Sequence, residues 1–179
     1  MSEKLKKEIF EWIKVFALAI VFAFIITQFI KPTLVRGDSM YSTLEEGDYL
    51  IINRMSYKFK EPEHGDIIVF ESDLKQDDGS SKDLVKRVIG VGGDKVKIEN
   101  NKVYVNDEEL NEPYIHNEIT EGDIDTVVPD GAVFVLGDNR EISLDSRYDS
   151  VGFISKSGIL GKKLQPALYV KTLRSIVPS

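Results

Sequence analysis

Lys95–Leu110, KVKIENNKVYVNDEEL, decides the fold class, because apolar and polar residues alternate on both sides of two central asparagines. An alternation with a period of two is typical of a β-strand that buries one of its faces. Asparagine adopts positive φ at low cost, so Asn100 and Asn101 predict a tight turn and the stretch a β-hairpin. The residues that should face each other across this hairpin are Val96, Ile98, Val103 and Val105.

Similar short runs lie on either side of this hairpin and are bounded by Gly-Asp pairs, which are typical of turns. They predict further strands in Tyr49–Phe59, Ile67–Ser72 and Ala132–Leu136. Asp73–Asp83 is polar without periodicity and should form a mobile connection between strands, whereas Ile159–Val177 is ambiguous. We therefore expect a mostly β domain whose short strands curl into a barrel-like sheet.

The composition fits one globular domain and excludes several classes of function. The chain has 179 residues, of which 42% are hydrophobic and 30% are charged, which argues against a disordered chain. A net charge of −7 argues against nucleic acid as a partner, because nucleic acid favours basic surfaces. The absence of cysteine excludes a thiolate nucleophile, and two histidines, His64 and His116, leave little material for a zinc site.

Phe10–Ile30 is long and apolar enough to cross a membrane. As a helix it would be roughly 31 Å long at ~1.5 Å per residue, which matches a hydrocarbon core of about 30 Å. More lysines precede the apolar run than closely follow it. This bias predicts a cytoplasmic N-terminus and an extracytoplasmic domain after the span.

Two alternatives for this segment, a cleaved signal peptide and a buried core helix, are disfavoured. Residues 28–30, Gln-Phe-Ile, are too large for the positions before a signal-peptide cleavage site, and a core helix would be less continuously apolar. Pro32 should end the helix, because proline donates no backbone hydrogen bond and disfavours helix at the residue before it. We therefore expect a tail at 1–9, an uncleaved anchor at 10–31 and an extracytoplasmic domain at 32–179.

A hydrolase without cysteine and with few histidines has a limited choice of activated nucleophiles, and a serine paired with a lysine amine is one. Such an amine normally titrates at about 10.4, so it must be kept neutral by burial among apolar groups. Lys86 lies between two apolar pairs in Asp83–Asp94, DLVKRVIGVGGD, which predicts a strand. The alternative, which spacing alone favours, is a lysine on an edge strand that points into solvent.

Two further stretches carry candidate polar groups. Gly137–Arg147, GDNREISLDSR, can supply charge pairs and hydrogen bonds around a site, although its composition also suits a solvated loop. Val35–Leu44, VRGDSMYSTL, places Ser39 just after the anchor and contains an Arg-Gly-Asp tripeptide, which is too short to argue for an adhesion ligand. The residues of the first stretch that could form charge pairs are Asp138, Arg140, Asp145 and Arg147.

The order of these stretches resembles that of bacterial type I signal peptidases, the membrane-anchored Ser/Lys endopeptidases that release exported proteins. The anchor is followed by VRGDSMYSTLEEGD, HGDIIVF, KRVIGVGGD, VYVNDEELNEPYI and VPDGAVFVLGDNREISLDSR, which together with the anchor cover most of the chain. The single anchor resembles the Gram-positive form. The resemblance implies an all-β catalytic core in 32–179, with a small β insertion within 94–128.

The resemblance also implies roles for individual residues. Ser39 matches the nucleophile and Lys86 the general base, and the backbone N–H of Ser39 is the natural first donor to the oxyanion. Ser143 matches the hydroxyl that orients the lysine amine. The residues that match the family's structural charge network are Arg87, Asp138, Asp145 and Arg147.

The implied substrates are exported preproteins, which would lie extended against strand edges with small residues at −3 and −1. Candidates for lining the substrate pockets are Met40, Ile67 and Val69. Some relatives use a hydroxyl two residues before the nucleophile as second oxyanion donor, but Gly37 occupies that position here, so this donor stays open. No metal or cofactor is expected, and the expected location is the cell membrane, with the lipid bilayer as a further partner.

The chain departs from the family pattern at Ser42 and Gly92, where the family usually has proline. Each change frees a φ angle, an effect of about 0.4–1 kcal/mol, and puts loop rigidity in doubt without removing a reacting group. Relatives with a histidine base and soluble Ser/Lys repressors are alternatives, but His64 and His116 are expected at the surface. From another class, a non-catalytic membrane-tethered β module could bind wall or partner proteins.

Overall fold

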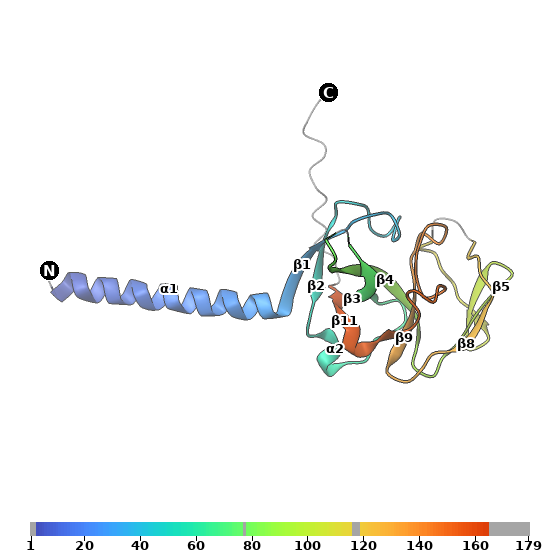
Figure 1. The fold of residues 1–179 in the computed structure, drawn as a ribbon. Coiled ribbons are helices and arrows are strands. Elements are labelled where there is room, and N and C mark those ends of the chain that lie inside the picture. The colour runs from blue at the N-terminus through green and yellow to red at the C-terminus, as the bar shows by residue number, and fades with distance from the viewer. Residues whose placement is uncertain (1–2, 77, 116–118, 165–179) are drawn as a thin grey trace, which may run out of the picture.

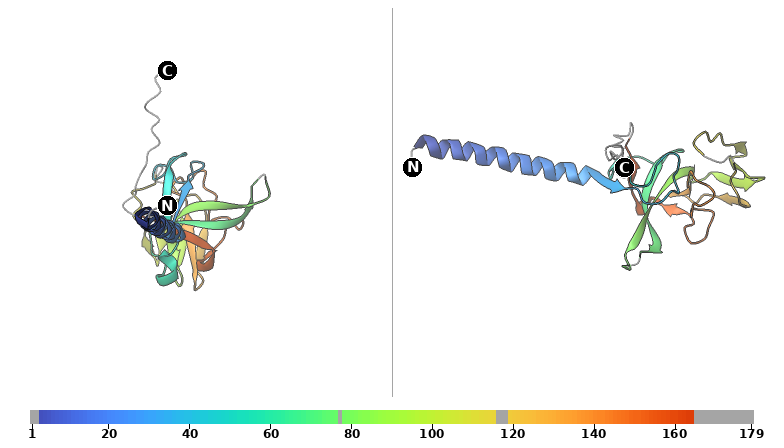
Figure 2. Two further views of the ribbon diagram at one scale, coloured as in Figure 1. Left: turned by 90° about the vertical axis from the view of Figure 1, so that its left-hand side faces the viewer. Right: turned by 90° about the horizontal axis from the view of Figure 1, so that it is seen from above.

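The computed structural model of the protein describes residues 3–76, 78–115 and 119–164 and consists of a long helix joined to a domain of two β-sheets (Figure 1). Helix α1, Glu3–Phe29, projects from the domain as a single rod, and none of its residues is buried (Figures 1 and 2). Its length and apolar composition suffice to cross a membrane. The rest of the described chain is mostly β, as predicted.

The chain passes from α1 directly into the larger sheet. Strand β1, Ile30–Leu34, follows Phe29 at once, so the helix ends two residues before the expected anchor boundary at residue 31 and before Pro32. Along its whole length β1 pairs antiparallel with β2, Tyr49–Asn53. Because β1 is an edge strand, Pro32 can lie within it without removing a ladder hydrogen bond that the sheet needs.

The larger sheet has seven strands in the order β1-β2-β11-β3-β4-β9-β10, and all neighbours are antiparallel. Its edges, β1 and β10, do not pair with each other, so the described strands form an open sheet and do not close into a full barrel. A 3₁₀ turn, Lys156–Gly158, precedes β11, which inserts between β2 and β3. The remaining strands are β3 Ile67–Lys75, β4 Ser81–Val91, β9 Ala132–Leu136, β10 Ile154–Ser155 and β11 Ile159–Lys163.

The smaller sheet contains the predicted hairpin and follows the order β7-β6-β5-β8. Val96 pairs with Val105 and Ile98 with Val103, which is the predicted register. The turn residues Asn100 and Asn101 adopt φ values of 51° and 64°, as a tight hairpin turn requires. The strands, β5 Lys95–Glu99, β6 Lys102–Val105, β7 Glu108–Glu109 and β8 Ile124–Val127, all lie within 94–128.

Two predictions about local structure are wrong. The strand expected over Tyr49–Phe59 ends at Asn53, whose side-chain oxygen accepts a hydrogen bond from the Met55 N–H at 2.9 Å and starts a turn into helix α2, Ser56–Phe59. Asp73–Asp83 is not a connection along its whole length, because β3 extends into it as far as Lys75 and β4 begins at Ser81, which pairs with Lys75. Its polar side chains lack periodicity because most of this two-stranded ribbon is exposed on both faces.

The core of the larger sheet lies partly beneath the loop that follows β1. Met40 and Leu44 of this loop are each 1% exposed and pack with apolar residues of β2 and β3. Because both side chains are fixed in one cluster, the residues between them are held against the sheet. The tail after residue 164 lies outside the described residues, so Ile159–Val177 is seen only in its first part, which forms β11.

Gly161→Ala should lower the melting temperature of the protein clearly, whereas Gly158→Ala, three residues earlier, should leave it nearly unchanged. A Cβ at residue 161 would lie 2.7 Å from the carbonyl oxygen of Asn53, so β11 and β2 must move apart. Such overpacking costs about 1–3 kcal/mol. A Cβ at residue 158 meets nothing within 4 Å. Thermal unfolding of the full chain in detergent measures both, and equal melting temperatures would contradict the β2–β11 packing.

Candidate active site

Ser39 lies in the loop between β1 and β2, and backbone hydrogen bonds close this loop at its base. The Val35 N–H donates to the carbonyl of Asp48 at 2.8 Å, and the Gly47 N–H donates back to the carbonyl of Val35 at 3.0 Å. Directly after Ser39, the buried Met40 side chain anchors the loop in the core. The position of Ser39 is therefore set by its neighbours and not by contacts of its own side chain with the core.

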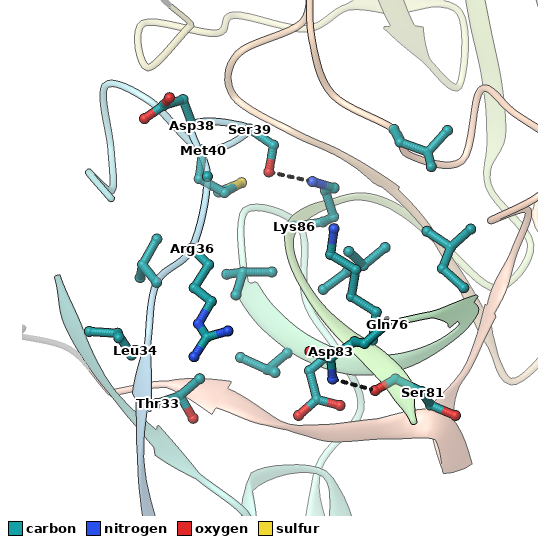
Figure 3. Close-up of a pocket in the computed structure, with 18 of the residues that line it drawn as sticks. Thr33, Leu34, Arg36, Asp38, Ser39, Met40, Gln76, Ser81, Asp83 and Lys86 are labelled. Atoms are coloured by element: carbon teal, nitrogen blue, oxygen red, sulfur yellow. Dashed lines mark hydrogen bonds between the residues drawn. The ribbon is translucent and has the colours of Figure 1, made fainter. Parts of the chain in front are cut away.

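Lys86 lies on β4, an interior strand between β3 and β9, and its partner on β3 is Ile68. It is only 2% exposed, so it is not the solvent-exposed edge lysine that spacing alone favoured. Its Nζ lies 2.6 Å from Ser39 Oγ, which brings together two residues 47 positions apart in the chain (Figure 3). The distance is short enough for a proton to pass between the two groups.

The environment of Lys86 favours its neutral form. Burial lowers the pKa of the Lys86 amine to about 8, because an ammonium loses its hydration among apolar groups. The carboxylates of Asp145 and Asp138 act in the opposite direction, whereas Lys82 and Arg147 add to the effect of burial. Desolvation is the largest of these causes, so the uncharged fraction of Lys86 at neutral pH is far greater than that of an ordinary lysine, although the ammonium form still predominates there.

Arg87, the next residue of β4, forms a bidentate ion pair with Asp138. Its Nε and Nη2 donate to the two carboxylate oxygens at 2.8 and 2.6 Å, and the Asp138 side chain is fully buried. The register of β4 and β9 explains this pair, because Arg87 lies opposite Leu136 and Asp138 follows two residues later. The guanidinium also lies 3.8 Å from the ring centroid of Tyr114.

The loop after β9 is held beside Ser39 by backbone contacts. The Asn139 N–H donates to the carbonyl of Ser39 at 3.1 Å, and the Gly137 N–H donates to Asp145 Oδ2 at 3.0 Å. A Cβ at residue 137 would lie 2.5 Å from the Ser39 carbonyl oxygen and closer still to Ser143 Oγ. Glycine is therefore the residue that lets these segments approach each other.

Asp145 and Arg147 form a second buried ion pair, with Arg147 Nε donating to Asp145 Oδ1 at 2.8 Å. The Arg147 guanidinium also donates to the carbonyls of Arg140 and Ser143 at 2.7 and 3.2 Å, which braces the loop from within. Ser143 is 3% exposed, and its Oγ makes no hydrogen bond with any described residue. Its hydroxyl lies close to Gly137 and makes no hydrogen bond with Lys86.

Arg140 forms an ion pair with Glu112, a residue outside its own loop, and the sequence did not predict this pair. Its Nη1 donates to Glu112 Oε2 at 2.9 Å and also contacts Thr120 Oγ1, and both partners precede β8 in the chain. Glu112 lies only two residues from Tyr114, which covers Arg87. The segment NEPYI was noticed only as part of the resemblance, and nothing in its composition marks Glu112 as a partner of Arg140.

A family profile described as "Signal peptidase, peptidase S26" matches residues 9–167. The chain belongs to this family. It is 40% identical over 177 residues to signal peptidase IB of Staphylococcus aureus (strain COL), and the alignment covers 88% of each chain. It is 36% identical over 171 residues to signal peptidase I of Bacillus licheniformis, and that alignment covers 89% of each chain. A crystal structure of a signal peptidase I from Enterococcus faecalis V583 aligns with a TM-score of 0.48 and 32% identity, covering 59% of this chain and 98% of that one.

A groove of about 540 Å³ runs from Ser39 and Lys86 towards β1, between the loop after β1 and the end of the β3–β4 ribbon (Figure 3). Met40 and Val69, two expected pocket residues, line this groove. Ile67, the third, is buried in the core and does not line it. The groove begins beside Thr33 and Leu34 of β1, close to the end of α1.

Ser42 and Gly92, where this chain lacks the family's usual proline, both lie in closely packed loops. Ser42 lies between the buried Met40 and Leu44, which are further joined by a backbone hydrogen bond of 2.8 Å. At Gly92 a Cβ would lie 3.1 Å from Asp130 Cα, so the backbone packs closely there. Both loops are therefore closely packed although neither position is a proline.

The histidines contribute nothing to this site among the described residues. His64 is half exposed, and its Nε2 lies 2.6 Å from Asp94 Oδ2 and not beside Ser39 or Lys86. His116 lies outside the described residues. Within the described ranges, no cluster of three or more His, Asp or Glu side chains could hold a metal ion.

Asp138→Ala should destabilise the protein by about 3–5 kcal/mol, because it leaves the Arg87 guanidinium buried without its partner. Glu109→Ala removes an exposed ion pair with Lys102 and should leave the melting temperature nearly unchanged. Thermal and urea unfolding of the two variants in detergent measure the difference. Similar melting temperatures would show that the Arg87–Asp138 pair is not buried as described.

Proposed function

We propose that this chain is a membrane-anchored serine endopeptidase that removes N-terminal signal peptides from exported preproteins. The observation that carries the proposal is the 2.6 Å contact between Lys86 Nζ and Ser39 Oγ at one end of an open groove. Membership of the signal peptidase family supports the substrate class, because similar chains bear that name. A purely structural lysine would not need a nucleophile beside its buried amine.

In the proposed acylation step, neutral Lys86 accepts the proton of Ser39 Oγ while this oxygen attacks the scissile carbonyl carbon. The tetrahedral intermediate collapses when its C–N bond breaks, and the Lys86 ammonium gives its proton to the departing amine of the mature protein. The signal peptide is then bound to Ser39 as an ester. No residue other than Ser39 and Lys86 has to change its protonation state.

In deacylation, a water molecule gives a proton to neutral Lys86 and attacks the ester carbonyl carbon. The Lys86 ammonium then gives this proton to Ser39 Oγ as the ester bond breaks, which releases the signal peptide with a free carboxyl group and restores the starting pair. The negative charge on the carbonyl oxygen needs hydrogen-bond donors in both steps. The Ser39 N–H donates to no described residue and is available as the first donor. Gly37 has no side chain, and its N–H lies 3.4 Å from Glu46 Oε1, so the second donor is not assigned.

The supporting residues act by positioning the pair. We propose that Ser143 orients the Lys86 amine when its otherwise unpartnered hydroxyl turns towards it, at a site where it is already buried. Asp138 and Arg87 fix the end of β9 beside β4, and Asp145 and Arg147 fix the loop that carries Ser143. The proposed steps require no metal or cofactor.

The groove accounts for the kind of substrate that we propose. An extended peptide could lie between the loop after β1 and β4, with its apolar part still in the membrane next to α1. Met40 and Val69 line the groove that contains Ser39, and their apolar side chains suit small apolar residues at −3 and −1 of the substrate. The lysine bias before the span supports a catalytic domain outside the cell and an N-terminus in the cytoplasm.

Ser39→Ala and Lys86→Ala should each abolish cleavage of a preprotein with an Ala-X-Ala site, because each removes one of the two reacting groups. Lys86→Arg should be equally inactive, since arginine keeps the charge but stays protonated and cannot act as the base. Purified full-length variants in detergent, incubated with the preprotein and analysed by the size of the product, provide the measurement.

Two control variants distinguish this dyad from its alternatives. Ser42→Ala changes an exposed serine of the same loop and should leave cleavage nearly unchanged. His64→Ala combined with His116→Ala should do the same, whereas a loss on the order of a thousandfold would indicate a histidine base. If the wild-type chain binds preproteins without cleaving them, the chain is a non-catalytic binding module instead.

The value of kcat/KM should rise about tenfold per pH unit below pH 8 and level off above it, because only neutral Lys86 accepts a proton and its pKa is about 8. Lys82→Gln removes a positive charge that lowers the pKa of Lys86, so it should move this limb to higher pH. Initial rates with a peptide substrate between pH 6 and 10 measure both. A limb near the ordinary histidine pKa of about 6.5 would contradict a lysine base.

A further inference from the structure

A basic and aromatic surface lies where the domain meets α1. It consists of Arg54, Lys58, Phe59 and Lys60, on and beside helix α2, and we call it the α2 patch. Phe59 is 82% exposed, more than any other large hydrophobic side chain of the described residues, including those of α1. None of the three cations forms an ion pair with a described residue.

The positive charge of the patch stands out in a chain with a net charge of −7. Two of the acidic residues that follow in the chain are neutralised by lysines of the C-terminal part of the domain, Glu61 by Lys156 and Asp66 by Lys162. Glu63 is the remaining exposed acidic residue of this segment. The three cations of the patch therefore exceed the exposed and unneutralised acidic residues of this segment.

The position of the patch is fixed relative to the end of α1. The backbone N–H of Arg54 donates to the carbonyl of Phe29, the last residue of α1, at 3.0 Å. Helix α2 begins only two residues after Arg54. α2 lies at the end of the domain from which α1 departs, and it is visible when the molecule is viewed along α1 (Figures 1 and 2). If α1 spans a membrane, the patch lies at the membrane surface.

We propose that the α2 patch binds the surface of the membrane that α1 spans, with Phe59 inserted at the headgroup level and the cations beside anionic lipid headgroups. The proposal rests on the membrane anchoring of the chain and not on its catalytic activity. An aromatic ring is favoured at a membrane interface. Cations interact with anionic headgroups within a Debye length of about 8 Å at physiological salt, so the attraction needs the short distance that the Arg54–Phe29 hydrogen bond imposes.

A second membrane contact would restrict how the domain rotates about α1. With α1 alone, the whole molecule could turn about the axis of α1 in the bilayer. With α2 also bound, the groove that begins at Thr33 and Leu34 keeps one direction relative to the bilayer. A peptide segment emerging from the same bilayer would then meet the groove in a constant orientation, which favours productive binding.

A single tryptophan placed in the patch tests this contact. The only tryptophan of the chain, Trp12, is replaced by phenylalanine, and Phe59→Trp is introduced into this full-length background. The protein is reconstituted into vesicles of phosphatidylcholine, with or without 30% phosphatidylglycerol, that carry a nitroxide quencher near the headgroups. Val127→Trp in the same background is the matched control, because Val127 is 61% exposed on β8, at the end of the domain far from α1 (Figure 1).

We expect blue-shifted and strongly quenched emission from the Phe59→Trp protein in the anionic vesicles, and weaker quenching in phosphatidylcholine alone or at 0.5 M NaCl. Adding Arg54→Gln, Lys58→Gln and Lys60→Gln together should reduce the quenching in anionic vesicles to the level seen in phosphatidylcholine. The Val127→Trp control should remain unquenched throughout. Emission from Phe59→Trp that matches this control in both lipids would overturn the proposal, as would quenching that is independent of phosphatidylglycerol and salt.

Cleavage assays separate this proposal from the proposed function. The triple glutamine variant should cleave a membrane-inserted preprotein several-fold more slowly than the wild type, but a short soluble peptide in detergent at an unchanged rate. If no variant cleaves any substrate, the peptidase function fails while the quenching result still decides the membrane contact. Emission from Phe59→Trp that changes only when preprotein is added would overturn the lipid contact and assign the patch to substrate binding.

Discussion

The Lys86 amine is buried beside the Ser39 hydroxyl. The free-energy cost of removing its ammonium form from water exceeds the electrostatic stabilisation that the carboxylates of Asp145 and Asp138 give it. This balance depends on how those carboxylates are engaged. Asp138 is held by Arg87 and Asp145 by Arg147, so each is already paired with a guanidinium. Because the carboxylates are neutralised by these arginines, desolvation dominates and the pKa of the lysine falls. The two arginine–aspartate pairs thus hold the loops of the site in place and still allow the pKa of Lys86 to be low.

The smaller sheet braces this arrangement from the side. Glu112, in the connection between β7 and β8, pairs with the buried guanidinium of Arg140, and Tyr114 covers that of Arg87. Both arginines are thereby satisfied by a segment that contributes no reacting group. The loop after β9, which contacts the carbonyl of Ser39 through Asn139, is held between the two sheets. The connection between β7 and β8 therefore supports the site although none of its described residues lines the groove.

Sequence reasoning succeeded where structure is local and failed where it depends on distant partners. The hairpin around Asn100 was predicted in the correct register, because alternation and turn preference act within a few residues. The parts of β3 and β4 within Asp73–Asp83 were missed, because most of this ribbon is exposed on both faces and carries no apolar stripe. The partnership of Arg140 with Glu112 was missed too, since both residues are ordinary charges in the sequence.

The sequence by itself determined the apolar span, the β character of the exposed domain and, through its motifs, a short set of candidate residues that includes Ser39, Lys86 and Ser143. These properties follow from periodicity, turn preference and residue type, which depend only on residues close together in the sequence. Only the tertiary structure decided that Lys86 lies on an interior strand, is buried, and contacts a serine 47 residues away. Burial and contact depend on which strands become neighbours, and that is settled by the packing of the whole sheet and not by any single stretch.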